Sequence, residues 1–415
     1  MPSKISHVPG ETESSPSRFA RMIMKFFPTL RQWRASYCSE PVSARNNVGR
    51  AALRLCLCTF TVATFSPAIA LPPAFAQFKP TMTIDEDCQA FAISQENRIV
   101  YAVPRIKRLK KVVIERDEIW VADWNGHTKR IVDVDKFMPI DHPSSYVVNS
   151  LSWSPDGRRI AMGMMTMPPE LRKLDQSESS NETGPPGGGK AIALFGDNGQ
   201  EIRVAGSKTR FIENGSNPMW LADDVNVAYL TGGGPYKIMR VNTSDGKTTT
   251  LFAGHTFDNV VWDARDNLAY AVGSDLSILG KTVIVQLNLM HETVEEIARL
   301  SDYRGELSIS PSRKKIAFFA DGDTVEVVDL ANPQKPVRVH AGYGRFEWSH
   351  DERRLLLKRG PDDQTNDLVW VGLADDSFTP ILHDLPFHDF HIAPNGESIV
   401  VMDPGKRVLK VFPLD

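Results

Sequence analysis

The chain has 415 residues, 41% of them hydrophobic, and a formal net charge of −3, so it is long enough to bury an ample core in one domain. From Gln77 onward it carries 39 Lys or Arg against 48 Asp or Glu, and this acidic balance argues against a nucleic-acid partner. Of the four cysteines only Cys88 lies in that part, which excludes an intramolecular disulfide there.

Residues 1–76 differ from the remainder in charge and in pattern. They hold nine Lys or Arg against three Asp or Glu, and Arg50 precedes an apolar run from Leu55 to Leu71. Ala74 to Ala76 then offers a small-x-small pattern ahead of Gln77. A basic segment, an apolar segment and small residues in this order are typical of a secretory signal. We predict a leader over 1–76 that is cleaved near 76/77, a periplasmic or secreted protein, and no stable membrane span after cleavage.

The remainder is organised around one repeated phrase, which is plainest from Trp153 to Ile160. Each copy begins with a large apolar residue and has another apolar residue seven places on, and most have Asp, Asn or Gly between, where a tight turn reverses the chain. The copies start 60, 67, 42, 47, 39 and 44 residues apart, and a period near 40 to 45 with short strands is typical of propeller blades. The seven copies are Ile93–Val100, Trp153–Ile160, Trp220–Val227, Trp262–Ala269, Ile309–Ile316, Trp348–Leu355 and Ile392–Ile399.

Two further strands follow the phrase in most repeats. In the first repeat a third strand is predicted over Glu118 to Asp123, a polar turn over Asn125 to His127, and a fourth strand through Arg130 to Val132. The sequence therefore predicts an all-β fold, a seven-bladed β-propeller of four-stranded antiparallel blades, as a single domain over 77–415. Third strands are predicted in later repeats over Ile192–Phe195, Ile238–Val241, Val325–Val328 and Leu368–Val371.

The seventh repeat stops at its third strand, Val408 to Phe412, because the sequence ends at Asp415. Pro80 to Ile84 has the pattern of a strand that precedes the first repeat and belongs to no meander of its own. Pairing of this segment with the last blade would supply the fourth strand and remove an exposed sheet edge. We therefore expect the N-terminal strand to complete the last blade.

The phrase from Trp153 to Ala161 resembles the WD40-like (PD40) repeat of the TolB-type β-propeller family, which also recurs in propeller domains of prolyl-oligopeptidase-type peptidases. The resemblance covers roughly residues 78–415. It implies the propeller fold but no particular activity, because propellers host many unrelated functions. The sequence ends with the last predicted blade, so we expect none of the hydrolase domain that accompanies peptidase propellers.

Two repeats carry long insertions between their second and third strands. The first, Pro104 to Lys111, places five Lys or Arg within seven residues, and the second, Pro168 to Lys190, is rich in Ser, Glu, Pro and Gly. Such loops open on the face where the innermost strands begin, so we expect the two to project side by side. The basic run could attract an anionic polymer, a phosphate or an acidic protein surface, or it could be a solvated hairpin. The second insertion could be an idle surface loop.

The innermost strands supply polar residues three or four places before the leading residue of each phrase. By the symmetry of the fold their side chains should converge on the mouth of the central channel. There they could orient a polar ligand or a peptide tail, or they could line a water-filled channel. We predict ligand-binding residues at Asn149, Asn217, Asn259, Glu306, Arg345, His388 and Asp389. Further residues at the same or the adjacent position are Gln89, Ser150, Ser216 and Asp258.

Metal binding and catalysis have little support in the sequence. His388 and His391 are an odd number of residues apart on a predicted strand, so their side chains point to opposite faces. Asp258, Glu306 and Asp389 offer oxygen ligands for a hard cation, but nothing in the sequence fixes their depth in the channel. The sequence has no nucleophile elbow, no His-Glu-x-x-His, no Cys-x-x-Cys and no phosphate loop. We predict no catalytic residue, no metal and no cofactor.

Two functions of different classes remain open. The favoured one is an exported, non-catalytic, monomeric β-propeller that binds a protein or a cell-envelope polymer through its channel-mouth and insertion-bearing face. The alternative is a lyase-like or lactonase-like propeller enzyme that acts on an anionic sugar or lactone at the channel mouth. Its site would use carboxylates such as Glu306 or Asp389 together with Arg345.

Overall fold

A computed structural model describes most of the chain beyond residue 78. The chain divides into two compact units, and the described residues belong to the unit formed by Phe75–Asn181 and Pro185–Asp415. The predicted leader, its cleavage site and most of the second insertion lie outside the described residues. In the described part no helix is long and apolar enough to cross a membrane. The described residues are 79–109, 112–133, 145–167, 170–171, 189–207, 211–274, 276, 281–300, 303, 305–321, 324–333, 335–340, 345–359, 366–385, 387, 389–403 and 407–414.

The regular elements are strands, and five sheets contain four antiparallel strands each. The first two are formed by β11 (Gly215–Trp220), β12 (Asn226–Thr231), β13 (Lys237–Asn242) and β14 (Thr248–Leu251), and by β15 (Phe257–Asp263), β16 (Leu268–Gly273), β17 (Thr282–Asn288) and β18 (Thr293–Leu300). The next two are formed by β19 (Gly305–Ile309), β20 (Lys315–Asp321), β21 (Thr324–Asp329) and β22 (Val337–His340), and by β23 (Phe346–Trp348), β24 (Arg354–Arg359), β25 (Asn366–Gly372) and β26 (Phe378–Leu385).

The fifth four-stranded sheet contains both ends of the described chain. It runs in the order β1 (Met82–Ile84), β29 (Leu409–Pro413), β28 (Ser398–Met402) and β27 (Asp389–Ile392). Strand β1 pairs antiparallel with β29, with Met82 opposite Val411 and Ile84 opposite Leu409. The prediction that the N-terminal strand completes the last blade is confirmed.

The prediction of seven four-stranded blades is wrong. The propeller has five such blades, and the strands of the first two repeats form one nine-stranded sheet. Its path is β10, β9, β7, β6, β4, β3 and β2, and β5 and β8 pair with β4. The two repeats join where Arg116 of β4 pairs in parallel with Tyr146 of β6. The nine strands are β2 (Ala90–Ile93), β3 (Ile99–Leu109), β4 (Val112–Ala122), β5 (Thr128–Val132), β6 (Ser145–Trp153), β7 (Arg159–Met167), β8 (Glu170–Leu171), β9 (Gly189–Gly196) and β10 (Ile212–Glu213).

Buried polar groups hold this junction together. The carboxylate of Asp117, which is 0% exposed, accepts the N–H of Val148 at 2.6 Å, and its backbone carbonyl accepts the Tyr146 hydroxyl at 3.1 Å. The N–H of Glu115 donates to the Ser145 hydroxyl at 3.0 Å. Burial raises the pKa of Asp117 to about 8 against the opposing hydrogen bond from Val148, because an ionised carboxyl is costly to bury. These contacts involve residues outside the repeated phrase, so the repeat pattern did not predict them.

The repeated phrase forms the turn between the first two strands of a repeat. In the second repeat the Ser154 hydroxyl accepts the N–H of Arg159 at 2.9 Å and donates to Asp156 at 2.5 Å, and Gly157 has a φ of +67°. Glycine adopts such a left-handed conformation at little cost. The Ser-x-Asp-Gly order is therefore explained by the geometry of a tight turn.

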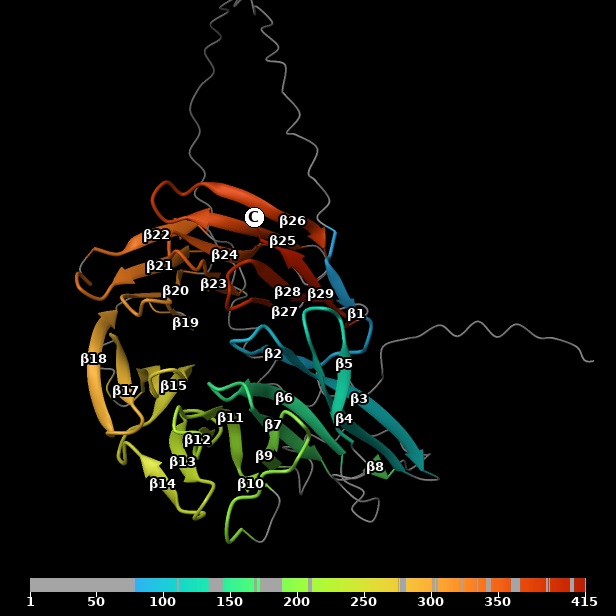
Figure 1. Cartoon of the computed structure of the whole chain (residues 1–415). Coiled ribbons are helices and arrows are strands. Elements are labelled where there is room, and N and C mark those ends of the chain that lie inside the picture. Colours follow the sequence, from blue (N-terminus) through green and yellow to red (C-terminus); the bar gives the residue numbers. More distant parts are fainter. Residues whose placement is uncertain are drawn as a thin grey trace, which may run out of the picture. The chain divides into compact units, whose positions relative to one another are not determined.

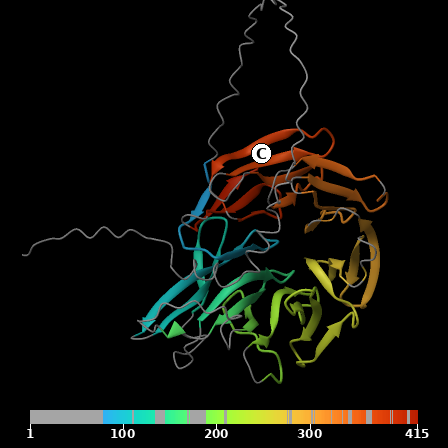
Figure 2. The same cartoon turned by 180° about the vertical axis from the view of Figure 1, so that it is seen from behind.

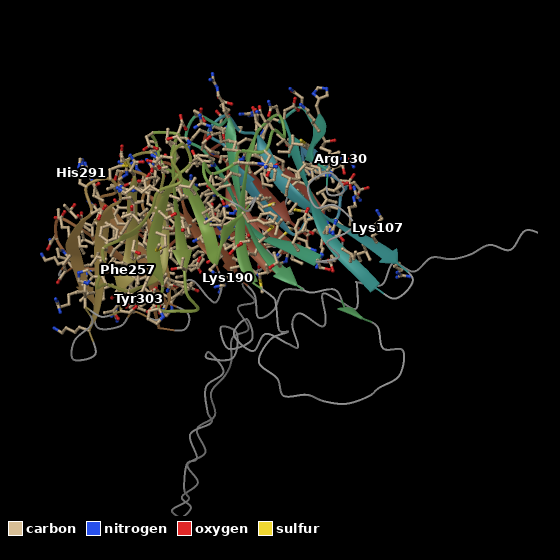
Figure 3. The ribbon with its side chains drawn as sticks, turned by 90° about the horizontal axis from the view of Figure 1, so that it is seen from below. Lys107, Arg130, Lys190, Phe257, His291 and Tyr303 are labelled. Atoms are coloured by element: carbon tan, nitrogen blue, oxygen red, sulfur yellow. The ribbon has the colours of Figure 1, made fainter. Side chains whose placement is uncertain are left out.

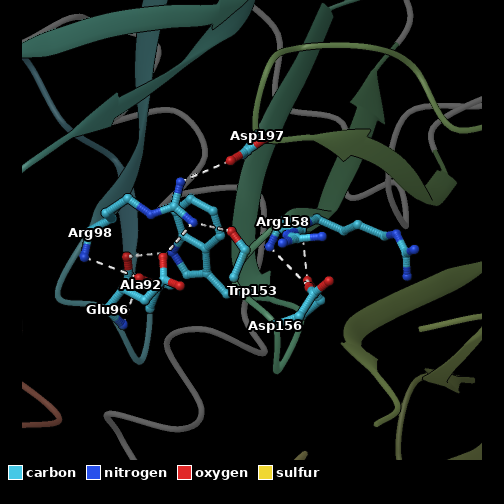
Figure 4. A network of polar contacts seen from close by, with 11 residues as sticks. Ala92, Glu96, Arg98, Trp153, Asp156, Arg158 and Asp197 are labelled. Carbon is cyan, nitrogen blue, oxygen red and sulfur yellow. Dashed lines mark hydrogen bonds and ion pairs between the residues drawn. The ribbon is translucent and has the colours of Figure 1, made fainter. Parts of the chain in front are cut away.

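The leading tryptophan connects its repeat to the preceding one. The indole N–H of Trp153 donates to the carbonyl of Ala92 at 3.3 Å, and the guanidinium of Arg98 lies 4.9 Å from the Trp153 ring centroid (Figure 4). Arg98 also forms an ion pair with Asp197 at 2.9 Å. Trp262 repeats the arrangement by donating to the carbonyl of Asn217 at 3.0 Å. These contacts link neighbouring repeats through the first residue of the phrase.

Within this unit the sheets follow one another around a central axis, and the first strand of each repeat lies innermost (Figure 1, Figure 2). Apolar side chains fill the space between successive sheets, as where Tyr270 and Ile284 share a buried cluster with Phe318. Figure 3 places Phe257 and Tyr303 along one rim and His291 along the opposite one. Phe257 opens an innermost strand, so its rim is the channel-mouth face.

Candidate functional site

The predicted site residues that the structure describes lie in the innermost strands or directly before them, and four of them coincide with a β-bulge. The register between the first two strands of a repeat shifts between Val148 and Ser150, between Ser216 and Met219, between Asp258 and Val261, and between Gly305 and Leu307. A bulge re-aims the side chain of the extra residue. The predicted site residues inside these shifts are Asn149, Asn217, Asn259 and Glu306.

Three of the bulged residues have left-handed backbone conformations. The φ angles are +47° at Asn217, +46° at Asn259 and +41° at Glu306. Asparagine tolerates this region well, whereas a longer side chain costs roughly 1–2 kcal/mol there. Glu306 therefore holds a strained backbone position that the two preceding repeats fill with asparagine. Strain of this kind often accompanies a functional side chain.

The structure brings three predicted residues together in one polar cluster. The Arg345 guanidinium donates to Asp389 at 2.5 Å, and both residues are partly exposed. Glu306 lies within electrostatic range of both. The guanidinium of Arg345 also lies 5.9 Å from the Phe390 ring centroid, so the ring packs beside the ion pair.

Two further members of the cluster were missed as site residues. Glu347 accepts a hydrogen bond from Arg345 at 3.1 Å, and its other carboxylate oxygen accepts the N–H of Ile392 at 2.7 Å. A ring nitrogen of His391 lies 2.8 Å from Glu347 and 3.0 Å from Arg345. We call Glu306, Arg345, Glu347, Asp389 and His391 the acidic arc.

A signal for these two residues was present in the sequence. Glu347 and His391 each stand one place before the leading residue of a phrase, two places after Arg345 and Asp389 respectively. Residues two apart on a strand share a face. The intervening Phe346 is 2% exposed and turned into the core. The alternation Arg-Phe-Glu and Asp-Phe-His thus places both polar pairs toward the channel.

Two carboxyl groups of the acidic arc, those of Glu306 and Glu347, have opposite pKa shifts. Burial raises the pKa of Glu306 to about 7, which the neighbouring Arg345 only partly offsets. Burial alone would also raise the pKa of Glu347, but His391 and Arg345 outweigh it and lower that pKa. Desolvation alone would lower the pKa of Arg345, but the three neighbouring carboxylates raise it. Glu347 is therefore ionised at neutral pH, whereas Glu306 is present in both its ionised and its neutral form there.

The predicted asparagines form no comparable cluster, and we call Asn149, Asn217 and Asn259 the amide arc. Asn149 is exposed and accepts a hydrogen bond from the Ser150 hydroxyl at 3.3 Å. Asn259 donates to the Tyr303 hydroxyl. Among the described residues no hydrogen bond joins one of the three asparagines to another or to a member of the acidic arc. His388 lies outside the described residues, so its place at the channel mouth stays a prediction.

The first insertion is a long hairpin that projects beside the second one. Strands β3 and β4 pair continuously from Ile99 opposite Ala122 to Leu109 opposite Val112. Strand β8, from the second insertion, pairs with the tip of β4, with Leu171 opposite Val112. The prediction that the two insertions lie side by side is confirmed for Glu170 and Leu171, and the rest of the second insertion up to residue 188 lies outside the described residues. Figure 1 shows the hairpin reaching beyond the neighbouring strands.

The described residues contain no group of three or more His, Cys, Asp or Glu that could hold a metal ion. In the acidic arc the guanidinium occupies the space between Asp389 and Glu347, where a cation would otherwise bind. Asp258, the third residue considered for a hard cation, accepts a hydrogen bond from the Ser274 hydroxyl at 2.6 Å. The expected absence of a metal and of a cofactor stays a prediction.

Comparisons with known proteins agree on the fold. No protein-family model matches the chain, and no curated protein matches it. A chain in the "Crystal Structure of Mitotic Checkpoint Complex" is similar with a TM-score of 0.52 and 14% identity, over 89% of this chain and 99% of that one. The β-propeller domain of Myceliophteria thermophila Cps50 (Swd1) is similar with a TM-score of 0.52 and 12% identity, over 81% of this chain and 100% of that one.

These similarities support an all-β, WD40-like β-propeller. At such low identity they carry the fold alone, because one fold hosts many functions. The resemblance of the phrase to the TolB-type family stays a prediction.

Proposed function

We propose that this β-propeller is a non-catalytic binding protein that holds a protein partner at its channel mouth, with a lysine or arginine side chain of the partner in the acidic arc. The observation that carries the proposal is the excess of carboxylates there. Glu306, Glu347 and Asp389 face a single guanidinium, that of Arg345. The arc thus holds three carboxyl groups against one permanently charged cation.

The internal contacts leave one carboxylate for a partner. Arg345 donates to Asp389 and to Glu347, so its guanidinium is already paired with two carboxylates of the arc. The carboxylate of Glu306 accepts the backbone N–H of Phe346 and has no cation in ion-pair contact within the described part of the chain. An arriving ammonium or guanidinium would stabilise its ionised form, since an opposite charge lowers a carboxyl pKa.

The enzyme alternative draws on the same residue. A carboxyl with a pKa of about 7 suits a general acid or base near neutral pH. An anionic sugar or lactone would, however, face the three carboxyl groups, and the guanidinium of Arg345 is already paired with two of them. The electrostatics of the arc therefore favour a cationic group over an anionic substrate.

Two further parts of the proposal rest on other grounds. One similar structure is titled as a protein complex, the mitotic checkpoint complex, which supports a protein rather than an envelope polymer as the partner. A location outside the cytoplasm is proposed from the leader sequence alone.

The variant Glu306→Asn tests the proposal because it separates stability from function. Asparagine relieves the left-handed strain, so we expect the variant to be about 1 kcal/mol more stable than the wild type in urea unfolding. Binding of an acetylated, amidated Gly-Gly-Arg-Gly-Gly peptide, followed by NMR titration, should be lost. A Gly-Gly-Glu-Gly-Gly peptide is the control and should not bind either protein. Unchanged binding of the arginine peptide by Glu306→Asn would contradict the proposal.

A further inference from the structure

The outer half of strand β3 has a free edge within the described residues. On one side β3 pairs with β4 along its whole length. On the other side β2 covers only Ile99 to Ala102. From Pro104 to Leu109 no described strand pairs with this second edge. An unpaired edge presents backbone donors and acceptors that can template another strand.

The side chains of this segment are exposed while those of its partner strand are buried. The four consecutive residues Arg105 to Arg108 are exposed, with 46% of Ile106 accessible. Opposite Arg105, Ile106 and Lys107, the side chains of β4 are buried, at Arg116, Glu115 and Ile114. The outer half of β3 is therefore the solvent-facing border of the hairpin, and Figure 3 places Lys107 on it.

We propose that the free edge of β3 binds an extended acidic segment of a partner polypeptide, which adds as a further strand to the hairpin. A polypeptide backbone matches the alternating donors and acceptors of the edge, which a phosphate or a polysaccharide does not. The cations Arg105, Lys107 and Arg108 select for carboxylates. The inference rests on the proposed function only in that the partner is a protein.

The alternation of side chains predicts a pattern in the partner. Arg105 and Lys107 share one face of the strand, and Ile106 and Arg108 share the other. Arg105 also forms an ion pair with Glu118 of β4 at 2.9 Å. On the face of Arg105 and Lys107, the partner segment should have acidic residues. On the other face it should have an apolar residue opposite Ile106 and an acidic residue opposite Arg108.

A purely protective role would explain the charges but not the isoleucine. Proline and lysine on an edge strand are common guards against edge-to-edge aggregation. Ile106 is one of four large hydrophobic side chains exposed in the described residues, and it stands between the cations of the same edge. An exposed isoleucine makes an edge strand less protected against aggregation, whereas it gives a binding edge an apolar contact with its partner.

The test uses an acetylated, amidated eight-residue peptide of alternating Glu and Val, with a Lys-Val peptide of equal length as the control. We expect the Glu-Val peptide alone to bind, and to slow amide hydrogen exchange in residues 105–109. The double variant Lys107→Glu and Arg108→Glu should weaken that binding at least tenfold. Lys129→Glu, half that change of charge at an exposed site on β5 of the same sheet, should leave it unchanged.

Three outcomes would overturn the inference. They are equal binding of the Lys-Val peptide, an unaltered affinity of the double variant, and slowed exchange that falls outside residues 105–109. The peptide comparison needs no variant, so it stands even if the double variant fails to fold. Glu306→Asn should retain Glu-Val binding because the arc and the edge are separate sites. Loss of Gly-Gly-Arg-Gly-Gly binding to the wild type with retained edge binding would therefore count only against the proposed function.

Discussion

The acidic arc and the amide arc occupy equivalent positions in successive repeats, but their residue types have different structural reasons. Asn217 and Asn259 adopt left-handed conformations that asparagine tolerates, so a backbone requirement explains their identity. Arg345 and Asp389 have no such angle and are instead engaged in an ion pair at 2.5 Å. Glu306 combines both features, with a left-handed φ of +41° and a carboxylate in the acidic arc.

The difference shows that a repeated polar position need not mean a ring of ligand-binding residues. One sector of the mouth has polar residues because of local backbone geometry, and the other has charged groups that contact across repeats. Only in the second sector is the residue type at odds with the local conformation, at Glu306. The variants below separate the two sectors by the size and the pH dependence of their effects.

The largest effect is expected from Arg345→Ala. Removal of the guanidinium leaves Asp389 and Glu347 without their shared donor and three carboxylates close together. Hydrogen bonds to charged groups contribute about 1.5–3 kcal/mol each when buried, and the partial exposure of this cluster reduces the total, so we expect a loss of about 2 kcal/mol in urea unfolding at pH 7.

Arg299→Ala is the matched control. Arg299 pairs with Glu296 at 2.6 Å on an exposed strand, where both side chains are about as accessible as those of ordinary surface pairs. Exposed ion pairs contribute 0–1 kcal/mol, so the control should lose less than about 0.5 kcal/mol. Equal losses in the two variants would mean that the acidic arc is an ordinary surface cluster.

A second prediction concerns opposite pH dependences within the arc. The pKa of Glu306 is raised to about 7, so its ionisation destabilises the folded protein as the pH rises from about 4.5 to about 7. Glu306→Gln removes this penalty and should gain stability relative to the wild type across that window, by about 1 kcal/mol. The pKa of Glu347 is lowered, so its contribution is present above about 4.5 and is lost as the pH falls through its folded pKa.

Glu347→Gln should therefore be less stable than the wild type at pH 6 to 7, and the deficit should shrink below about pH 4.5. Thermal unfolding of both variants from pH 4 to 8 measures the two slopes. If the stability differences of the two variants changed with pH in the same direction, the opposite pKa shifts of Glu306 and Glu347 would be contradicted.

Much of the fold could be predicted because the residues of the repeated phrase determine their local structure. The apolar residue at each end, the serine and the Asp-Gly turn specify two strands and their connection locally, as the Ser154 and Gly157 geometry shows. The division into sheets could not be predicted in the same way. The first two repeats share a sheet through Asp117 and Val148, which are 31 residues apart and outside the phrase.

The candidate site was predicted in part for a similar reason. Aligning the repeats located Glu306, Arg345 and Asp389, since all stand three places before a leading residue. It could not tell that only some of these positions would meet, because the contact between Arg345 and Asp389 crosses from one sheet to the next. Glu347 and His391 were accessible to the same alignment one place before the leading residue, where no polar residue was sought.

The smallest effect is expected in the amide arc, at Asn217. If its left-handed backbone, with a φ of +47°, is the whole reason for asparagine, Asn217→Gly should change stability by less than about 0.5 kcal/mol, because glycine adopts this region freely. Asn217→Ala should cost about 1 kcal/mol, because alanine has a Cβ that clashes there. Both variants keep the carbonyl that accepts the Trp262 indole, so urea unfolding reads the side chain alone. A loss above about 1 kcal/mol in the free energy of unfolding of Asn217→Gly would show that the side-chain amide makes stabilising contacts. The amide arc, like the acidic arc, would then be stabilised by side-chain interactions.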